Sequence, residues 1–224
     1  MHSTLHDVRG GAWRRVAAAA ALAASLMAVV PPPNTLWSEE DKAETPTEAV
    51  RVVLTEVFRI LEEPSLKAPS QQAERRRLLE ETISRRFDYR EMSKRTLASH
   101  WSRLTDAERE EFVDLFKNFL SDRYAGKIAG YSGEKVHYLG ERLEGQFAEV
   151  RTKLVSNKVE IPMDYRLINK DRRWYAYDII ADGVSLVKNY RSQFDKIIGS
   201  ESYAELTKRL RNRTVTEGVK KKRD

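Results

Sequence analysis

The chain has 224 residues, enough for one domain or two small ones, and 41% of them are hydrophobic, which excludes wholesale disorder. A mean hydropathy of −0.61 excludes a polytopic membrane protein, and the absence of cysteine excludes disulfides, thiolate metal sites and a cysteine nucleophile. The net charge of +6 belongs to the C-terminal end, where basic residues outnumber acidic ones. We expect residues 214–224 to form a disordered basic tail, which could contact anionic lipid headgroups.

The N-terminal segment has the pattern of an export signal. Arg9, Arg14 and Arg15 precede the apolar run Val16–Val30, and three prolines follow it. The run is short for a membrane span, which needs roughly 20 residues, although an uncleaved N-terminal anchor is the alternative. We therefore expect residues 1–37 to be a signal peptide and the mature chain to reside in a bacterial periplasm.

Four helices are predicted after a polar linker at residues 38–44. Thr45 and Glu48 form a capping box at the start of the first helix, and Pro64 ends it. Residues 75–86 and 92–100 are expected to form shorter helices. A second capping box, Thr105 with Glu108, opens the helix with the widest apolar stripe, which comprises Phe112, Leu115, Phe116, Phe119, Leu120 and Tyr124.

The hydrophobic period then changes from that of a helix to that of a strand. Strands are predicted over residues 135–141, 147–155, 161–167 and 173–180, with a turn at 169–171. Two helices, at 184–198 and 202–210, complete the pattern. The order of elements is helices, then an antiparallel meander, then helices again. This order predicts one α+β domain at 45–213. We expect its helices to pack on a curled, mainly antiparallel four-stranded sheet that encloses an apolar pocket.

The search for catalytic chemistry is largely negative. The chain contains no nucleophile elbow, phosphate-binding loop or dinucleotide fingerprint, and His100 and His137 lack the spacing of a metal-ligand pair. We expect no catalytic residue and no metal site. Four carboxylates could act as general bases if a closed pocket held them, or could serve as caps, turns and ion pairs: Asp88, Asp164, Asp178 and Asp182. Asp178 could pair with Arg191.

Two blocks of sequence resemble the MlaC family of periplasmic phospholipid carriers, also called toluene-tolerance or auxiliary transport proteins. The first is Phe87-Asp88-Tyr89-Arg90-Glu91-Met92-Ser93 with Leu97 and Trp101, followed by the apolar helix 108–124. The second runs from Trp174 through Asp178, Gly183-Val184-Ser185-Leu186 and Asn189-Tyr190-Arg191 to Gln193-Phe194. The similarity covers about residues 45–212. Ala98 departs from the pattern, because a glycine is common at this position in the family.

The resemblance implies a monomeric carrier that is not an enzyme. Such a protein would hold lipid acyl chains in an apolar cavity and shuttle phospholipid between two partners. These partners are an outer-membrane lipoprotein complex and an inner-membrane ABC transporter with an MCE-domain subunit. The resemblance implies no cofactor beyond the phospholipid cargo and no nucleic acid, and it leaves the transport direction open.

The physical demand on such a carrier is large. Each buried CH₂ group is worth about 0.8 kcal/mol, so the roughly 30 such groups of a two-chain lipid represent about 25 kcal/mol. A cavity nearly as apolar as a bilayer meets this demand without any reaction. The facing directions of the predicted helices and strands give the expected lipid-binding residues: Phe112, Phe116, Leu120, Tyr124, Tyr138, Val150, Met163, Tyr165, Tyr177, Ile179, Val184 and Val187.

Two other functions remain open on the sequence. One is a small enzyme on a cone-shaped α+β scaffold that uses a buried carboxylate, Asp88 or Asp178, as its acid or base. The other is an anchored interaction protein that contacts anionic membranes through the basic tail.

Overall fold

The computed structural model describes residues 43–130, 133–156, 160–213 and 215. The predicted signal peptide, most of the linker and nearly all of the basic tail lie outside these residues. Within them, no helix is both long enough and apolar enough to cross a membrane. The helices are α1 (Pro46–Glu62), α2 (Gln72–Ser84), α3 (Tyr89–Leu97), α4 (Asp106–Ala129), α5 (Leu186–Ser200) and α6 (Tyr203–Arg211), with short 3₁₀ turns η2 (Pro64–Leu66), η3 (Pro69–Gln71) and η4 (Ala98–Arg103).

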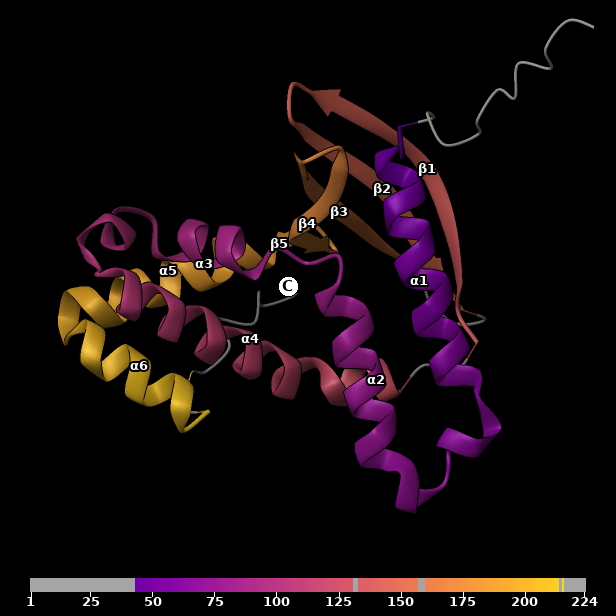
Figure 1. Ribbon diagram of the computed structural model, residues 1–224, viewed down its shortest axis with the longest axis horizontal. Coiled ribbons are helices and arrows are strands. Elements are labelled where there is room, and N and C mark those ends of the chain that lie inside the picture. The colour runs from indigo at the N-terminus through magenta and orange to yellow at the C-terminus, as the bar shows by residue number, and fades with distance from the viewer. Residues whose placement is uncertain (1–42, 131–132, 157–159, 214, 216–224) are drawn as a thin grey trace, which may run out of the picture. The chain divides into compact units, whose positions relative to one another are not determined.

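The strands form one antiparallel sheet in the order β1-β2-β3-β4-β5 (Figure 1). They are β1 (Lys135–Glu144), β2 (Phe147–Val155), β3 (Glu160–Lys170), β4 (Arg173–Ala181) and β5 (Val184–Ser185). The α+β class is confirmed, but the expected number of strands is wrong, because the sheet has five. Asp182 and Gly183, with φ of 49° and 75°, turn the chain so tightly that Val184 and Ser185 pair back onto β4 before α5 begins.

Helix starts follow the capping residues. Thr45 and Thr105 each accept a hydrogen bond from the backbone N–H three residues on, and Glu48 and Glu108 return the bond, so both predicted capping boxes are confirmed. The third helix begins at Tyr89, earlier than expected, because the side chain of Asp88 accepts from the Glu91 N–H at 2.9 Å.

Buried side chains form three clusters. The helical core lies among α3, α4, α5 and α6 and comprises Met92, Leu97, Phe112, Phe116, Phe119, Leu120, Val187, Tyr190, Phe194, Leu206, Leu210 and Val215. The sheet core joins α1 to one face of the sheet, here called the inner face, and comprises Ala49, Val50, Ala148, Val150, Tyr165, Leu167, Trp174 and Ala176. The hairpin core lies between α1 and α2 and comprises Val57, Ile60, Leu61 and Leu79.

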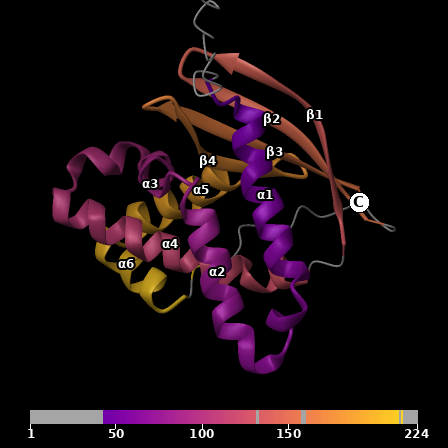
Figure 2. The ribbon, with the colours of Figure 1, turned by 45° about the vertical axis from the view of Figure 1, so that its right-hand side comes forward.

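The clusters occupy different parts of the fold. Figure 1 and Figure 2 show α1 along the sheet, the bundle of α3 to α6 beside it, and the loop between α1 and α2 projecting away from the sheet. Phe87 packs against both the helical core and the sheet core. Backbone hydrogen bonds hold the chain on each side of Phe87 against β4: Asp88 N–H donates to the Ala176 carbonyl, and Ala176 N–H to the Arg86 carbonyl, each at 2.8 Å.

Two bulges interrupt the sheet. In β1 the register shifts between Tyr138 and Gly140, which makes Leu139 the extra residue. In β4 the partners of Arg166 and Leu167 are Asp178 and Ala176, which makes Tyr177 the extra residue. The β4 bulge changes which side chains share a face of the sheet. The alternation of side chains between the two faces is shifted by one residue at the bulge.

Ala98 has an unusual backbone conformation. It ends α3 with φ of 48° and ψ of −117°, a region that glycine reaches easily and that is strained for a residue with a Cβ. This is the position at which a glycine is expected from the resemblance.

Candidate functional site

The expected lipid-binding residues lie in several places. Tyr138, Val150, Met163, Tyr165 and Ile179 all belong to the sheet core or pack against it, on the inner face under α1. Val150 and Tyr165 are buried, whereas Tyr138, Met163 and Ile179 are only half-buried. These half-buried side chains have apolar surface that a ligand could still cover.

A second group lies in the helical core. Phe112, Phe116, Leu120 and Val187 are buried there, and Tyr124 packs at its edge with its hydroxyl 3.3 Å from that of Tyr190. Phe116 contacts Phe194 edge-to-face, with ring centroids 5.3 Å apart. The aromatic side chains of the helical core therefore pack against one another.

The remaining two residues of the set lie outside both groups. Val184 is 56% exposed on β5. Tyr177 is buried, but the β4 bulge turns it to the outer face, opposite Ile179, where its ring contacts Phe147 at 6.1 Å between centroids. The twelve residues therefore do not surround a single space, and their part in lipid binding stays a prediction.

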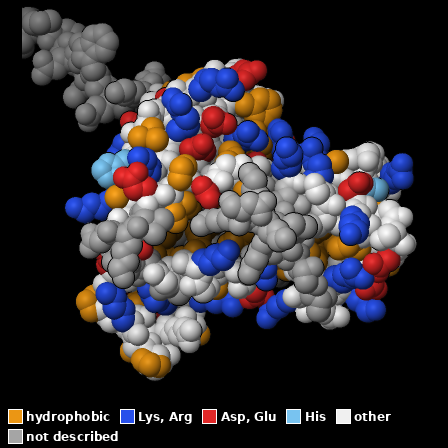
Figure 3. Space-filling model, turned by 180° about the vertical axis from the view of Figure 1, so that it is seen from behind, with side chains coloured by type: hydrophobic (Ala, Val, Ile, Leu, Met, Phe, Trp, Pro, Cys, Tyr) orange, Lys and Arg blue, Asp and Glu red, His pale blue; other side chains and the backbone are white. Residues whose placement is uncertain are grey.

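Sequence reasoning missed half-buried apolar residues of the helices that pack against the sheet core or the hairpin core. Leu54 of α1 packs against the sheet core, and Val53 of α1 and Ile128 of α4 pack against the hairpin core. Their signal in the sequence was an apolar position at helical spacing, which does not distinguish a core residue from a ligand contact. Figure 3 shows small patches of hydrophobic side chains on one face, interspersed with charged side chains.

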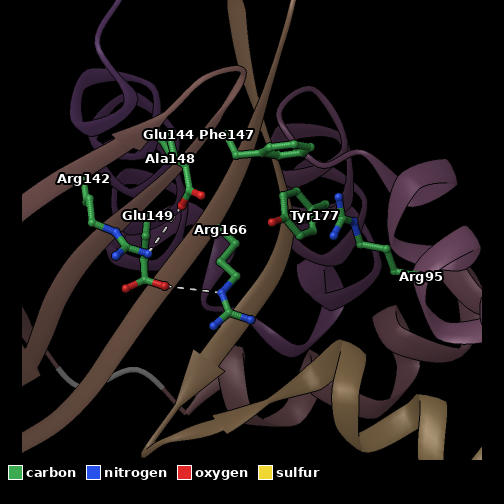
Figure 4. A pocket seen from close by; sticks show the side chains of 8 residues that line it. All are labelled: Arg95, Arg142, Glu144, Phe147, Ala148, Glu149, Arg166 and Tyr177. Atoms are coloured by element: carbon green, nitrogen blue, oxygen red, sulfur yellow. Dashed lines mark hydrogen bonds and ion pairs between the residues drawn. The ribbon is translucent and has the colours of Figure 1, made fainter.

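A pocket of about 280 Å³ opens on the outer face of the sheet (Figure 4). Three arginines from different elements reach it, Arg95 from α3, Arg142 from β1 and Arg166 from β3; its other lining residues are Glu144, Phe147, Ala148, Glu149 and Tyr177. The Arg95 guanidinium lies 4.1 Å from the centre of the Tyr177 ring. This pocket is charged, unlike the apolar pocket expected from the sequence, which stays a prediction.

Carboxylates in and beside the pocket pair with its arginines. Arg166 Nε lies 3.3 Å from a Glu149 oxygen, and Arg95 Nε donates to Glu91 at 2.7 Å. Burial raises the pKa of the Tyr177 hydroxyl, and the nearby Arg95 and Arg166 oppose this shift. The pocket was not visible in the sequence, because its arginines are separated by dozens of residues and lie on three elements.

The candidate carboxylates have structural partners. Asp178 is 2% exposed and accepts from the Val187 N–H at 3.0 Å and from the Ser185 hydroxyl at 2.6 Å, which fixes the start of α5. Its ion-pair partner is Arg166, at 3.6 Å. The expected pair with Arg191 is wrong, because the Arg191 guanidinium instead donates to the Arg95 carbonyl at 2.8 Å.

Asp88 and Asp164 likewise serve the fold. Asp88 caps α3 and forms an ion pair with Lys170, and Asp164 accepts from the Thr152 N–H at 3.3 Å. Asp182 lies in the turn before β5. Among the residues that the structure describes, no group of three or more histidine or acidic side chains could hold a metal ion.

Comparison with known proteins gives consistent results. A family model described as "MlaC protein" matches residues 51–212. The chain is 25% identical, over 101 residues, to the intermembrane phospholipid transport system binding protein MlaC of Haemophilus influenzae. That alignment covers 42% of this chain and 47% of the relative, so it spans about half the length of the relative.

A solved structure has a similar fold over most of its length. It is the phospholipid-binding protein of Ralstonia solanacearum in complex with a phospholipid, with a TM-score of 0.67 and 25% sequence identity. The match covers 74% of this chain and 94% of that protein.

Proposed function

Because the chain belongs to the MlaC family, whose model matches residues 51–212, we propose that it binds a phospholipid and carries it between membranes. The observation that carries this proposal is the shared fold with a protein whose structure contains a phospholipid, over 94% of that protein. The name of the Haemophilus influenzae relative supports the transport role.

The acyl chains are proposed to lie against the inner face of the sheet, between the sheet, α1 and the end of α4. Half-buried apolar side chains of three parts of the fold are proposed to form its walls: Leu54 on α1, Met163 and Ile179 on β3 and β4, and Tyr124 and Ile128 on α4. Covering such surface with an alkyl chain gains about 25 cal/mol for each square ångström removed from water. The charged pocket on the outer face is unsuited to alkyl chains, since burying its guanidinium and carboxylate groups without water is costly.

The cellular setting is part of the same proposal. The protein acts in the periplasm after export. It exchanges lipid with an inner-membrane ABC transporter complex that carries an MCE-domain subunit and with an outer-membrane lipoprotein complex. The basic tail at 214–224 is proposed to support contacts with anionic headgroups rather than lipid loading.

The test is native mass spectrometry of the purified protein with and without Met163→Glu. We expect one diacyl phospholipid on the wild-type chain and little or none on the variant, because a carboxylate on the inner face opposes alkyl chains. Leu139→Glu is the matched control, since Leu139 is 55% exposed at the β1 bulge, away from the proposed walls. Equal loading of Met163→Glu and wild type would contradict the proposed location.

The buried position of Leu120 makes it unsuitable for this test. Leu120 is 7% exposed inside the helical core, so a glutamate there would unfold the bundle before it reported on lipid.

A further inference from the structure

The two ends of the α1–α2 hairpin are held in different ways. At its base, Glu44 and Arg86 form a two-pronged ion pair with both distances at 2.8 Å, and the Trp174 indole N–H donates to the Glu44 carbonyl at 3.0 Å. Thr47 N–H donates to Glu141 of β1 at 2.8 Å. The base is therefore fixed to both β1 and β4, next to the buried residues of the sheet core.

Away from the base, α2 meets α4 mainly through polar side chains. Arg76 pairs with Asp122, and Ser121 donates to Glu80, whose carboxylate also accepts from Arg76 Nε at 2.7 Å. Arg213, which follows α6, reaches the same Asp122 carboxylate at 2.5 Å. We name these five residues, Arg76, Glu80, Ser121, Asp122 and Arg213, the Asp122 latch.

The apolar side of α2 is used within the hairpin. Leu78, Leu79 and Ile83 belong to the hairpin core or pack against it, facing α1. Ile128 supplies an apolar contact from α4 to that core. Separating α2 from α4 would therefore expose little apolar surface, and water could solvate the charged groups of the latch. We therefore expect the boundary between α2 and α4 to open more easily than the helical core or the sheet core.

The boundary adjoins the proposed acyl-chain site. Tyr124 and Ile128, which were proposed above as one wall of that site, follow Asp122 on α4 within two turns of the helix. Figure 1 and Figure 2 both show α4 passing α2 near this end, while the far loop of the hairpin extends past it. We propose that the Asp122 latch closes the acyl-chain site, and that lipid enters and leaves between α2 and α4 when the latch opens. This inference rests on the proposed function.

The first test removes the charge of the latch. Asp122→Asn keeps the side-chain shape but weakens the pairing with both Arg76 and Arg213. Release of a fluorescent phospholipid from the loaded protein to acceptor vesicles should become about threefold to tenfold faster, the range expected when partly exposed ion pairs are lost. Asp114→Asn, an exposed carboxylate on the same helix, is the matched control and should release lipid at the wild-type rate. Equal rates for the two variants would overturn the latch.

The second test locks the boundary. Because the chain contains no cysteine, Arg76→Cys with Asp122→Cys provides two unique thiols for a short, reducible bis-methanethiosulfonate bridge. Bridging the loaded protein should slow lipid release at least tenfold, and a reductant should restore it. The same bridge between Arg77→Cys and Glu81→Cys, both on α2, should leave release unchanged.

The outcomes separate the two proposals. A wild-type protein that neither copurifies with phospholipid nor takes it up from vesicles overturns the proposed function and the latch together. A wild-type protein that transfers phospholipid at a rate unaffected by the bridge between residues 76 and 122 overturns the latch alone.

Discussion

The helical core and the sheet core contain similar residues but are closed to different degrees. In the helical core Phe112, Phe116 and Phe194 have no exposed surface, and each ring contacts another. On the inner face of the sheet, buried residues such as Val150 lie beside the half-buried Met163 and Ile179. Apolar residues of the helical core are fully covered by other parts of the fold, whereas some apolar residues on the inner face of the sheet keep exposed surface.

The largest expected effect tests the closed region. Phe116→Ala removes a fully buried ring and should lower the free energy of unfolding by about 3–5 kcal/mol, measured by urea denaturation. Met163→Ala should cost less than about 1.5 kcal/mol, because its side chain is only partly packed, yet of the two variants it should be the one that binds lipid more weakly. Similar destabilisation by the two variants would remove the distinction between the regions.

An intermediate effect should appear at high pH. Burial raises the pKa of Tyr89, which packs against the helical core, from 10.0 to about 12. Folding therefore favours the neutral phenol of Tyr89. Its preference for the neutral form contributes about 2–3 kcal/mol to the free energy of unfolding. This contribution is fully present below pH 10 and is lost as the pH rises towards 12. Tyr89→Phe should flatten the fall in unfolding free energy between pH 10 and 12. An unchanged pH profile would show that the phenol is hydrated in the folded protein.

The smallest effect concerns the end of α3, at the border of the helical core. Ala98→Gly should raise the free energy of unfolding by about 1 kcal/mol, because glycine adopts φ of 48° and ψ of −117° without the strain of a Cβ. The matched control, Ala107→Gly on the exposed side of α4, should lower it by about 0.5–1 kcal/mol. A loss of stability in both variants would mean that the backbone at residue 98 is relaxed.

Much of the fold was predictable because it depends on local signals. The two capping boxes and the four longer strands have patterns that a short stretch of sequence contains in full. The two-residue strand β5 was missed because Val184 and Ser185 are too few to show a period, and they become a strand only through their pairing with β4.

The candidate site was less predictable, since periodicity identifies a buried face but not its partner. The stripe with Phe112 and Phe116 was correctly read as apolar, yet α5 and α6 cover it within the helical core. Tyr177 and Ile179 are two residues apart, which predicts one shared face, but the bulge places them on opposite faces. The position of this bulge is defined only by the pairing of β4 with β3, which the sequence of β4 alone does not contain.

The bulge in β1 also affects how molecules meet one another. β1 forms an edge of the sheet, and an uninterrupted edge is a template on which a neighbouring chain could add strands. The additional residue at Leu139 and the glycine after it, with φ of 134°, break the regular row of hydrogen-bonding groups halfway along this edge. The edge strand of the sheet thus carries its own obstacle to the addition of strands from a second molecule.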